Sequence, residues 1–147
     1  MRSLVVEDDV TSRLALQGLL TRYGKVDTAP DGQAAVAALR TALGARAPYD
    51  LVCLDILMPG LDGQAVLREL RTLEDLHGID LGYGAKVIMT SVLKDSSSIN
   101  GAFRAQCDAY LVKPVDGSRM DAQLRKLSLV ELTGAKAPAR ASPAARK

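Results

Sequence analysis

The chain has 147 residues, 48% of them hydrophobic and 24% charged, so it has the size of one ordinary domain and is too apolar to remain unfolded throughout. Aromatic residues make up only 3%, with one Phe and no Trp, which argues against a base-stacking surface for single-stranded nucleic acid. Residues 133–147 hold four basic residues and no acidic one, which leaves 15 basic and 17 acidic residues in 1–132 and excludes a strongly basic folded body.

Five short, mostly apolar segments predict the strands of a parallel sheet. They are residues 3–6, 25–28, 51–54, 86–89 and 110–112, and the second is the least apolar. Short apolar runs that alternate with segments of helical period are typical of a sheet built from βαβ units. Right-handed crossovers then place helices on both faces, so the sequence predicts an α/β fold in which a strand and a helix alternate five times.

The five helices are predicted from apolar positions at helical spacing and from capping residues. They run from about 10 to 23, 31 to 43, 62 to 76, 96 to 106 and 116 to 127, and the second, third and fifth begin at Asp31, Asp62 and Asp116. Leu14, Leu16, Leu19 and Leu20 form the apolar stripe expected for the first helix. Residues 77–84 are expected to form a glycine-containing loop before the fourth strand.

Other features of the chain carry weaker expectations. Residues 133–147 have two prolines and no apolar period, which predicts a disordered basic tail after a domain of residues 1–132. Cys53, Cys107 and His77 are not at metal-ligand spacing, and we assign them to packing and to the surface. We expect a cytoplasmic protein without a signal peptide or a membrane span, because no apolar run approaches the length of either.

Polar side chains stand where four of the predicted strands end. The first strand is followed by Glu7-Asp8-Asp9, the third by Asp55, the fourth by Thr90-Ser91 and the fifth by Lys113-Pro114. Ligands bind beyond the carboxyl ends of the strands of an open parallel sheet, so these side chains are expected to converge. Converging carboxylates need a cation, and a set of oxygen ligands without His or Cys favours Mg²⁺.

The same residues are suited to phosphoryl transfer. A carboxylate can attack phosphorus and form an aspartyl phosphate, which makes Asp55 the candidate nucleophile. Lys113 would balance the phosphoryl oxygens, and the Thr90 hydroxyl would donate a hydrogen bond to one of them. Taken singly, the acidic triplet is better explained by helix capping, and we assign Asp9 to that role. If each stood alone, Thr90 could equally be a helix-capping hydroxyl and Lys113 a surface lysine.

Four segments together resemble a known family. They are residues 6–9 (Val-Glu-Asp-Asp), 54–63 (Leu-Asp-Ile-Leu-Met-Pro-Gly-Leu-Asp-Gly), 89–91 (Met-Thr-Ser) and 110–114 (Tyr-Leu-Val-Lys-Pro). In this order they resemble the signature segments of bacterial two-component response-regulator receiver domains of the chemotaxis type. The resemblance covers about residues 2–131, and it implies a receiver domain over 1–132 with the flavodoxin-like, doubly wound fold and the strand order 2-1-3-4-5.

The resemblance also implies roles for single residues. Asp55 would be the phosphoacceptor, and Mg²⁺ would be held by Asp8 and Asp55 directly, by Glu7 through water and by the backbone carbonyl of Leu57. Thr90 and Lys113 would contact the phosphoryl group, and the Lys113–Pro114 bond is expected to be cis. Tyr110 would be an aromatic switch that turns inward with Thr90, although it could also be a simple edge-strand aromatic.

In function, the resemblance implies a single-domain response regulator. A sensor histidine kinase or a histidine phosphotransfer protein would phosphorylate it, and the surface of the fourth helix, fifth strand and fifth helix would signal to a downstream protein. We expect a monomer or weak dimer, no direct DNA binding, and no enzymatic activity beyond its own phosphorylation and dephosphorylation. Two rivals are an interaction module that takes no phosphate and an aspartyl-nucleophile phosphatase; the latter needs a second Asp where Leu57 stands.

Two departures from the family pattern lead to further expectations. Thr90 follows Asp55 by 35 residues, several more than is typical, and we place the surplus in the loop 77–84 on the side opposite the site. Positions two residues after Asp55 and two after Thr90 commonly carry polar side chains, but here they are Leu57 and Val92. Since neither can hold an attacking water, we expect slow loss of phosphate.

Overall fold

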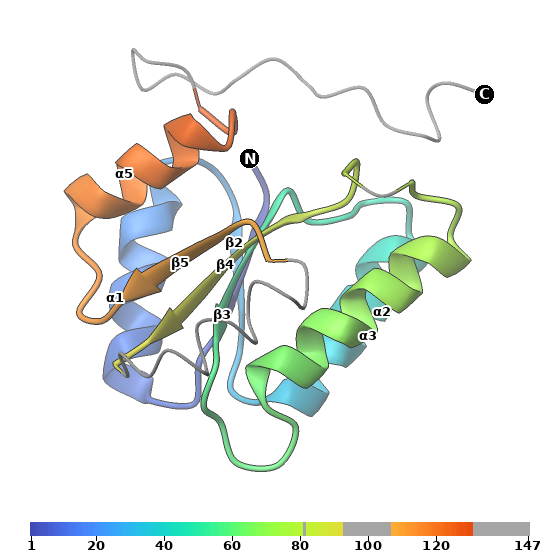
Figure 1. Ribbon diagram of the computed structural model, residues 1–147, viewed down its shortest axis with the longest axis horizontal. Coiled ribbons are helices and arrows are strands. Elements are labelled where there is room, and N and C mark those ends of the chain that lie inside the picture. Colours follow the sequence, from blue (N-terminus) through green and yellow to red (C-terminus); the bar gives the residue numbers. More distant parts are fainter. Residues whose placement is uncertain (81, 93–106, 131–147) are drawn as a thin grey trace.

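The computed structural model describes residues 1–80, 82–92 and 107–130, which form a parallel sheet between two layers of helices (Figure 1). The strands are β1 (Ser3–Val6), β2 (Val26–Ala29), β3 (Leu51–Asp55), β4 (Lys86–Ser91) and β5 (Ala109–Val112). Their order across the sheet is β2-β1-β3-β4-β5, and all neighbours are parallel. The predicted α/β class and the strand order implied by the resemblance are both confirmed.

Helices cover both faces of the sheet. The described helices are α1 (Val10–Thr21), α2 (Gly32–Gly44), α3 (Gly63–Leu76) and α5 (Gly117–Lys126). One core cluster packs α2 and α3 against the sheet, and a second packs α1 and α5 against its other face (Figure 1). The predicted helix 96–106 and the predicted tail 133–147 lie outside the described residues. None of the helices in the described part of the chain has the length and apolar character needed to cross a membrane.

An aspartate begins each of these four helices. The side chains of Asp9, Asp31, Asp62 and Asp116 accept hydrogen bonds of 2.7–2.9 Å from the N–H groups of Ser12, Ala34, Ala65 and Arg119, respectively. Each bond satisfies an N–H group that has no partner within the helix, and losing such a cap typically costs about 1 kcal/mol. The predicted caps, including the assignment of Asp9 to capping, are confirmed.

The apolar stripe expected for the first helix is wrong at one position. Leu16 and Leu20 are buried against the sheet, but Leu14 is 60% exposed. Leu14 lies two residues from Leu16, which is about 200° around an α-helix, so the two side chains cannot face the same layer. The helix thus covers the sheet with a narrower stripe and leaves Leu14 on the surface.

The strands that carry the site extend further than the sequence predicts. β3 includes Asp55, and β4 continues through Thr90 and Ser91. The ladder also continues beyond β3, because the Ile56 N–H donates to the Thr90 carbonyl at 2.9 Å. The polar residues that end these strands are therefore held by the sheet itself. Residues 77–80 and 82–84 precede the amino end of β4, at the end of the sheet opposite Asp55, and that this loop holds the surplus residues stays a prediction.

Candidate functional site

The carboxyl ends of β1, β3, β4 and β5 bring the candidate residues to one edge of the sheet. Asp55, the last residue of β3, is paired in register with Thr90 of β4. The Lys113 N–H donates to the Ser91 carbonyl at 2.9 Å, which extends the β4–β5 ladder to the lysine. Backbone hydrogen bonds of the sheet thus fix the starting points of all three side chains, although Asp55 and Lys113 are far apart in sequence.

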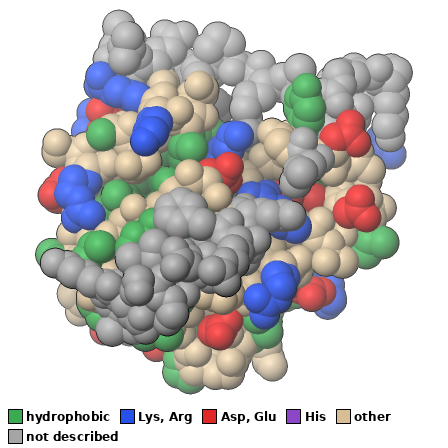
Figure 2. All heavy atoms as spheres, in the orientation of Figure 1, with side chains coloured by type: hydrophobic (Ala, Val, Ile, Leu, Met, Phe, Trp, Pro, Cys, Tyr) green, Lys and Arg blue, Asp and Glu red, His purple; other side chains and the backbone are tan. Residues whose placement is uncertain are grey.

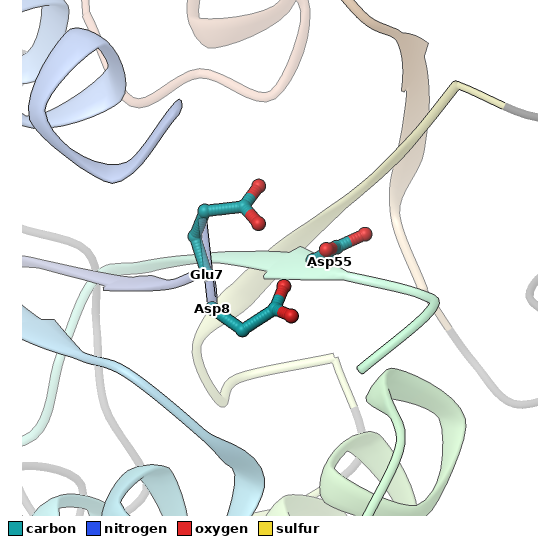
Figure 3. Close-up of side chains that lie close together, drawn as sticks. All are labelled: Glu7, Asp8 and Asp55. Carbon is teal, nitrogen blue, oxygen red and sulfur yellow. The ribbon is translucent and has the colours of Figure 1, made fainter. Parts of the chain in front are cut away.

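Three carboxylates meet at this edge. Glu7 and Asp8 follow β1, and with Asp55 they offer carboxylate oxygens that all lie within 4.8 Å of one another (Figure 3). Glu7 is fully buried and Asp55 nearly so, whereas Asp8 is exposed. The cluster is therefore closed on the side of the sheet and open to solvent at Asp8.

Among the described residues, Lys113 brings a cation into contact with this cluster. Its Nζ is hydrogen-bonded to Glu7 Oε1 and lies 3.3 Å from Asp55 Oδ2. The Lys113–Pro114 peptide bond is cis, as the resemblance implies. One ammonium group cannot neutralise three carboxylates, so the site keeps a negative charge whenever all three are ionised.

The pKa of Asp55 reflects its burial and its charged neighbours. Burial and the neighbouring Glu7 carboxyl raise this pKa to about 7, while the attraction of Lys113 acts in the opposite direction. A carboxyl whose ionised form is disfavoured in this way gains from a nearby positive charge. Among the described residues, the three carboxylates outnumber the one ammonium group, so a divalent cation would offset the remaining negative charge.

The residues present fit Mg²⁺. All three side chains offer oxygen, the ligand atom that this ion prefers, and sites with few carboxylates leave room for water and an incoming phosphate. The Leu57 N–H lies 3.3 Å from Asp55 Oδ1, which places the Leu57 backbone beside the cluster. That the Leu57 carbonyl is a ligand, and that Glu7 acts through water, stay predictions.

The Thr90 hydroxyl is buried without a partner. Its side chain is fully inaccessible to solvent, and no hydrogen-bond partner for Oγ1 exists among the described residues. A buried hydroxyl left unpaired costs about 1–3 kcal/mol, so its presence beside Asp55 favours a ligand oxygen that completes it. Tyr110 is half-buried, lies opposite Met89 in the ladder and packs against the core cluster of α2 and α3. Its role as a switch stays a prediction.

Two apolar side chains stand exposed next to the site. Leu57 is 50% exposed two residues after Asp55, and Val92 is 67% exposed two residues after Thr90. Neither side chain can hold a water molecule by a hydrogen bond. By contrast, Cys53 is fully buried in the core and His77 lies on the surface, in agreement with their assignment to packing and surface.

Sequence reasoning missed two arginines that contact the backbone of the site. Arg13, in the first turn of α1, donates to the Glu7 carbonyl at 2.9 Å. Arg119, in the first turn of α5, donates to the Val112 and Pro114 carbonyls. Their positions in the sequence were the signal that could have identified them. The helix dipole disfavours a cation in the first turn, so an arginine there suggests a specific contact.

A cavity of about 240 Å³ at the opposite edge of the sheet is a weaker candidate. It is lined by Arg71, Gly82, Gly84, Ala85, Lys86, Cys107 and Asp108. Its cations are already paired, because Arg71 forms ion pairs with Glu74 and Asp108, and Lys86 forms one with Asp108. These ion pairs leave little charge for a ligand, whereas at the carboxyl ends of the strands three carboxylates meet the single ammonium group of Lys113 among the described residues.

Comparisons with known proteins show the family of the chain. The family model described as "Response regulator receiver domain" matches residues 3–125. The transcriptional regulatory protein AfsQ1 of Streptomyces coelicolor is 34% identical over 123 residues, which are 83% of this chain and 48% of that protein. The response regulator PleD of Caulobacter vibrioides is 33% identical over 132 residues, 89% of this chain and 27% of that protein. The chain thus spans less than half the length of these relatives.

Solved structures share the fold. The receiver domain of the histidine kinase CKI1 from Arabidopsis thaliana, complexed with Mg²⁺ and BeF₃⁻, has a TM-score of 0.75 and 26% identity, covering 86% of this chain and 88% of that one. The chemotaxis protein CheY4 of Vibrio cholerae has a TM-score of 0.71 and 21% identity, covering 86% of this chain and 97% of that one. The second similarity concerns the fold alone.

Proposed function

The chain belongs to the response-regulator receiver family, and from that premise we propose that it accepts a phosphoryl group on Asp55 in a Mg²⁺-dependent reaction. The observation that carries the proposal is the meeting of Glu7, Asp8 and Asp55 within 4.8 Å at the strand edge, with Lys113 against them. Each of the three groups needed for phosphoryl transfer is thereby present: a nucleophile, a metal-binding pair of acids and a balancing cation.

The proposed reaction moves the phosphoryl group from a phosphohistidine to Asp55. A carboxylate oxygen of Asp55 forms the new P–O bond while the P–N bond of the donor breaks, and the donor imidazole keeps the electron pair and takes up a proton. Lys113 neutralises charge on the phosphoryl oxygens, and the Thr90 hydroxyl donates a hydrogen bond to one of them. Mg²⁺, held by Asp8, Asp55, Glu7 through water and the Leu57 carbonyl, would supply the positive charge that the site lacks.

The partners we propose are proteins. The donor is a sensor histidine kinase or a histidine phosphotransfer protein, and exposed apolar side chains near the site give it a surface to bury: Val10, Leu14, Leu57 and Val92. The output surface is β5, α5 and the predicted helix 96–106, read by a downstream protein as Thr90 and Tyr110 rearrange. Acidic and basic side chains are interspersed on the face drawn in Figure 2, which supports a protein partner rather than direct DNA binding.

The rival readings predict different chemistry. A pure interaction module would take no phosphate. The buried Thr90 hydroxyl, which has no partner among the described residues, would then have no phosphoryl oxygen to bind. An aspartyl-nucleophile phosphatase would turn over phosphate esters, but Leu57 occupies the position where its second Asp is needed. The chain would therefore catalyse only its own phosphorylation and dephosphorylation.

A mass measurement tests the proposal. The protein incubated with Mg²⁺ and phosphoramidate should gain one phosphoryl adduct, and Asp55→Asn should gain none, because its amide cannot act as the nucleophile. Asp62→Asn is the matched control, since Asn can keep the helix cap that Asp62 makes at Ala65 N–H. The absence of an adduct on the wild type, or its persistence in Asp55→Asn, would refute the proposal.

The apolar pair beside the site predicts a long-lived phosphoryl group. Leu57→Asn is expected to shorten the half-life of the adduct by about tenfold, because an amide can orient the attacking water that Leu57 cannot hold. The decay of the adduct after removal of the donor measures this half-life. Leu76→Asn, which changes an exposed leucine at the end of α3, should leave it unaltered. A wild-type half-life of seconds, or an unchanged half-life in Leu57→Asn, would contradict the prediction.

A further inference from the structure

The turn that carries Lys113 lies at the outer edge of the sheet. β5 is the last strand in the order, and the Lys113 N–H points inward, to the Ser91 carbonyl of β4. Successive residues of a strand direct their backbone groups alternately to its two sides, so the Val112 carbonyl points outward. No further strand of the described chain pairs with that side, so neither the Val112 carbonyl nor the Pro114 carbonyl, which lies beyond the end of β5, has a partner within the sheet.

Arg119 donates hydrogen bonds to both carbonyls. Its Nη1 donates to the Val112 carbonyl at 2.9 Å and to the Pro114 carbonyl at 3.0 Å. One guanidinium nitrogen thus bridges the residues on either side of Lys113. The backbone of Arg119 is itself held, because its N–H donates to the capping carboxylate of Asp116 at 2.7 Å. The bridge therefore starts from a fixed point on α5.

The position of Arg119 in its helix is unfavourable by itself. A cation in the first turn faces the positive end of the helix dipole, which typically costs about 0.3–1 kcal/mol. The other basic residues at the ends of α5, Arg125 and Lys126, stand in the last turn, where the dipole favours them. Arg119 thus departs from the preference for cations in the last turn, and the two hydrogen bonds to carbonyls compensate for its unfavourable position.

We propose that Arg119 is a positioning residue for phosphoryl transfer. By bridging the carbonyls that flank Lys113, it fixes the backbone from which the ammonium reaches Glu7 and Asp55. The Lys113 side chain has many rotatable bonds, so its aim depends on how firmly its backbone is held. This inference rests on the proposed function, since it assigns Arg119 a part in that reaction through Lys113.

The test compares Arg119→Met with the wild type and with Arg125→Met. Arg119→Met removes both donors and should slow phosphoryl uptake from phosphoramidate, and weaken beryllofluoride binding, by about tenfold. Its Mg²⁺ affinity should not fall, because the carboxylates that would hold the ion follow β1 and end β3, away from Arg119. Arg125 lies on the same helix but pairs with Asp121, so Arg125→Met should keep the wild-type rate. Arg119→Lys, which retains donors for the carbonyls, should restore most of the loss.

A double-mutant cycle separates positioning from a general structural role. If Arg119 acts through Lys113, the Lys113→Met, Arg119→Met double variant should be no slower than Lys113→Met alone. Additive losses, or a wild-type rate in Arg119→Met, would overturn the inference. Should Arg119→Met fail to fold, Arg119→Gln replaces it in the same cycle. If the wild type itself takes up no phosphoryl group, the proposed function fails. That outcome is distinct from additive losses and from a wild-type rate in Arg119→Met, which refute only the role of Arg119.

Discussion

Lys113→Met is expected to slow phosphoryl uptake on the order of 100-fold and, at the same time, to tighten Mg²⁺ binding. The rate falls because the Lys113 ammonium is the charge that can meet the phosphoryl oxygens as they approach Asp55. Removing one such preorganised donor from a site of this kind typically costs two to three orders of magnitude, as for an oxyanion hole.

The second effect has the opposite sign because Lys113 and a metal ion compete for the same oxygens. Nζ contacts Glu7 and lies 3.3 Å from Asp55 Oδ2, so it already screens two of the three carboxylates. Without the ammonium, the carboxylates repel one another more strongly and gain more from a divalent ion. A variant that merely disrupted the site would instead lose rate and metal affinity together.

Calorimetric titration with Mg²⁺ and the rate of adduct formation from phosphoramidate measure the two effects. Lys86→Met is the matched control, because Lys86 stands at the amino end of β4 and its Nζ pairs with Asp108 at 3.9 Å. This variant should change neither quantity. Weaker Mg²⁺ binding in Lys113→Met would contradict the competition between the ammonium and the ion.

The site could be predicted from the sequence because its residues follow directly from strand ends. Asp55, Thr90 and Lys113 each stand at or just after the carboxyl end of an apolar strand, and a parallel sheet brings such positions together whatever their separation along the chain. The local sequence pattern and the geometry of a parallel sheet were sufficient to predict that these residues lie close together. The same holds for the capping aspartates, whose partners lie three residues away.

Features that depend on contacts between distant elements could not be predicted in this way. Glu74 has the sequence context of a surface residue of α3, yet it is buried and accepts from the Ala85 N–H at 2.7 Å and from Arg71 at 2.9 Å. Its position is possible because Gly84 has no side chain: a Cβ there would stand 2.1 Å from the Glu74 carboxylate. The sequence of α3 does not indicate that the loop before β4 will cover Glu74. In the same way, the sequence of α5 does not indicate that Arg119 will bind the Val112 and Pro114 carbonyls.

Gly63→Ala is expected to destabilise the fold by more than about 3 kcal/mol, well beyond what the change from Gly to Ala costs or gains in an open helix. Gly63 begins α3, and its N–H donates to the Ile56 carbonyl at 3.0 Å. A Cβ at this position would lie 2.2 Å from the Asp55 carbonyl oxygen and 2.9 Å from the Ile56 Cα. Because both obstacles are backbone atoms, the helix start or the end of β3 must move.

Gly18→Ala provides a control of opposite sign. Gly18 lies inside α1, and nothing stands within 4 Å of the place its Cβ would take, so the substitution should stabilise the protein by about 0.5–1 kcal/mol. Urea unfolding measures both free energies on the same scale. Since the end of β3 carries Asp55, any Gly63→Ala protein that remains folded should also take up phosphoryl groups more slowly, whereas Gly18→Ala should not. A Gly63→Ala variant as stable as the wild type would mean that the start of α3 does not approach the end of β3 this closely.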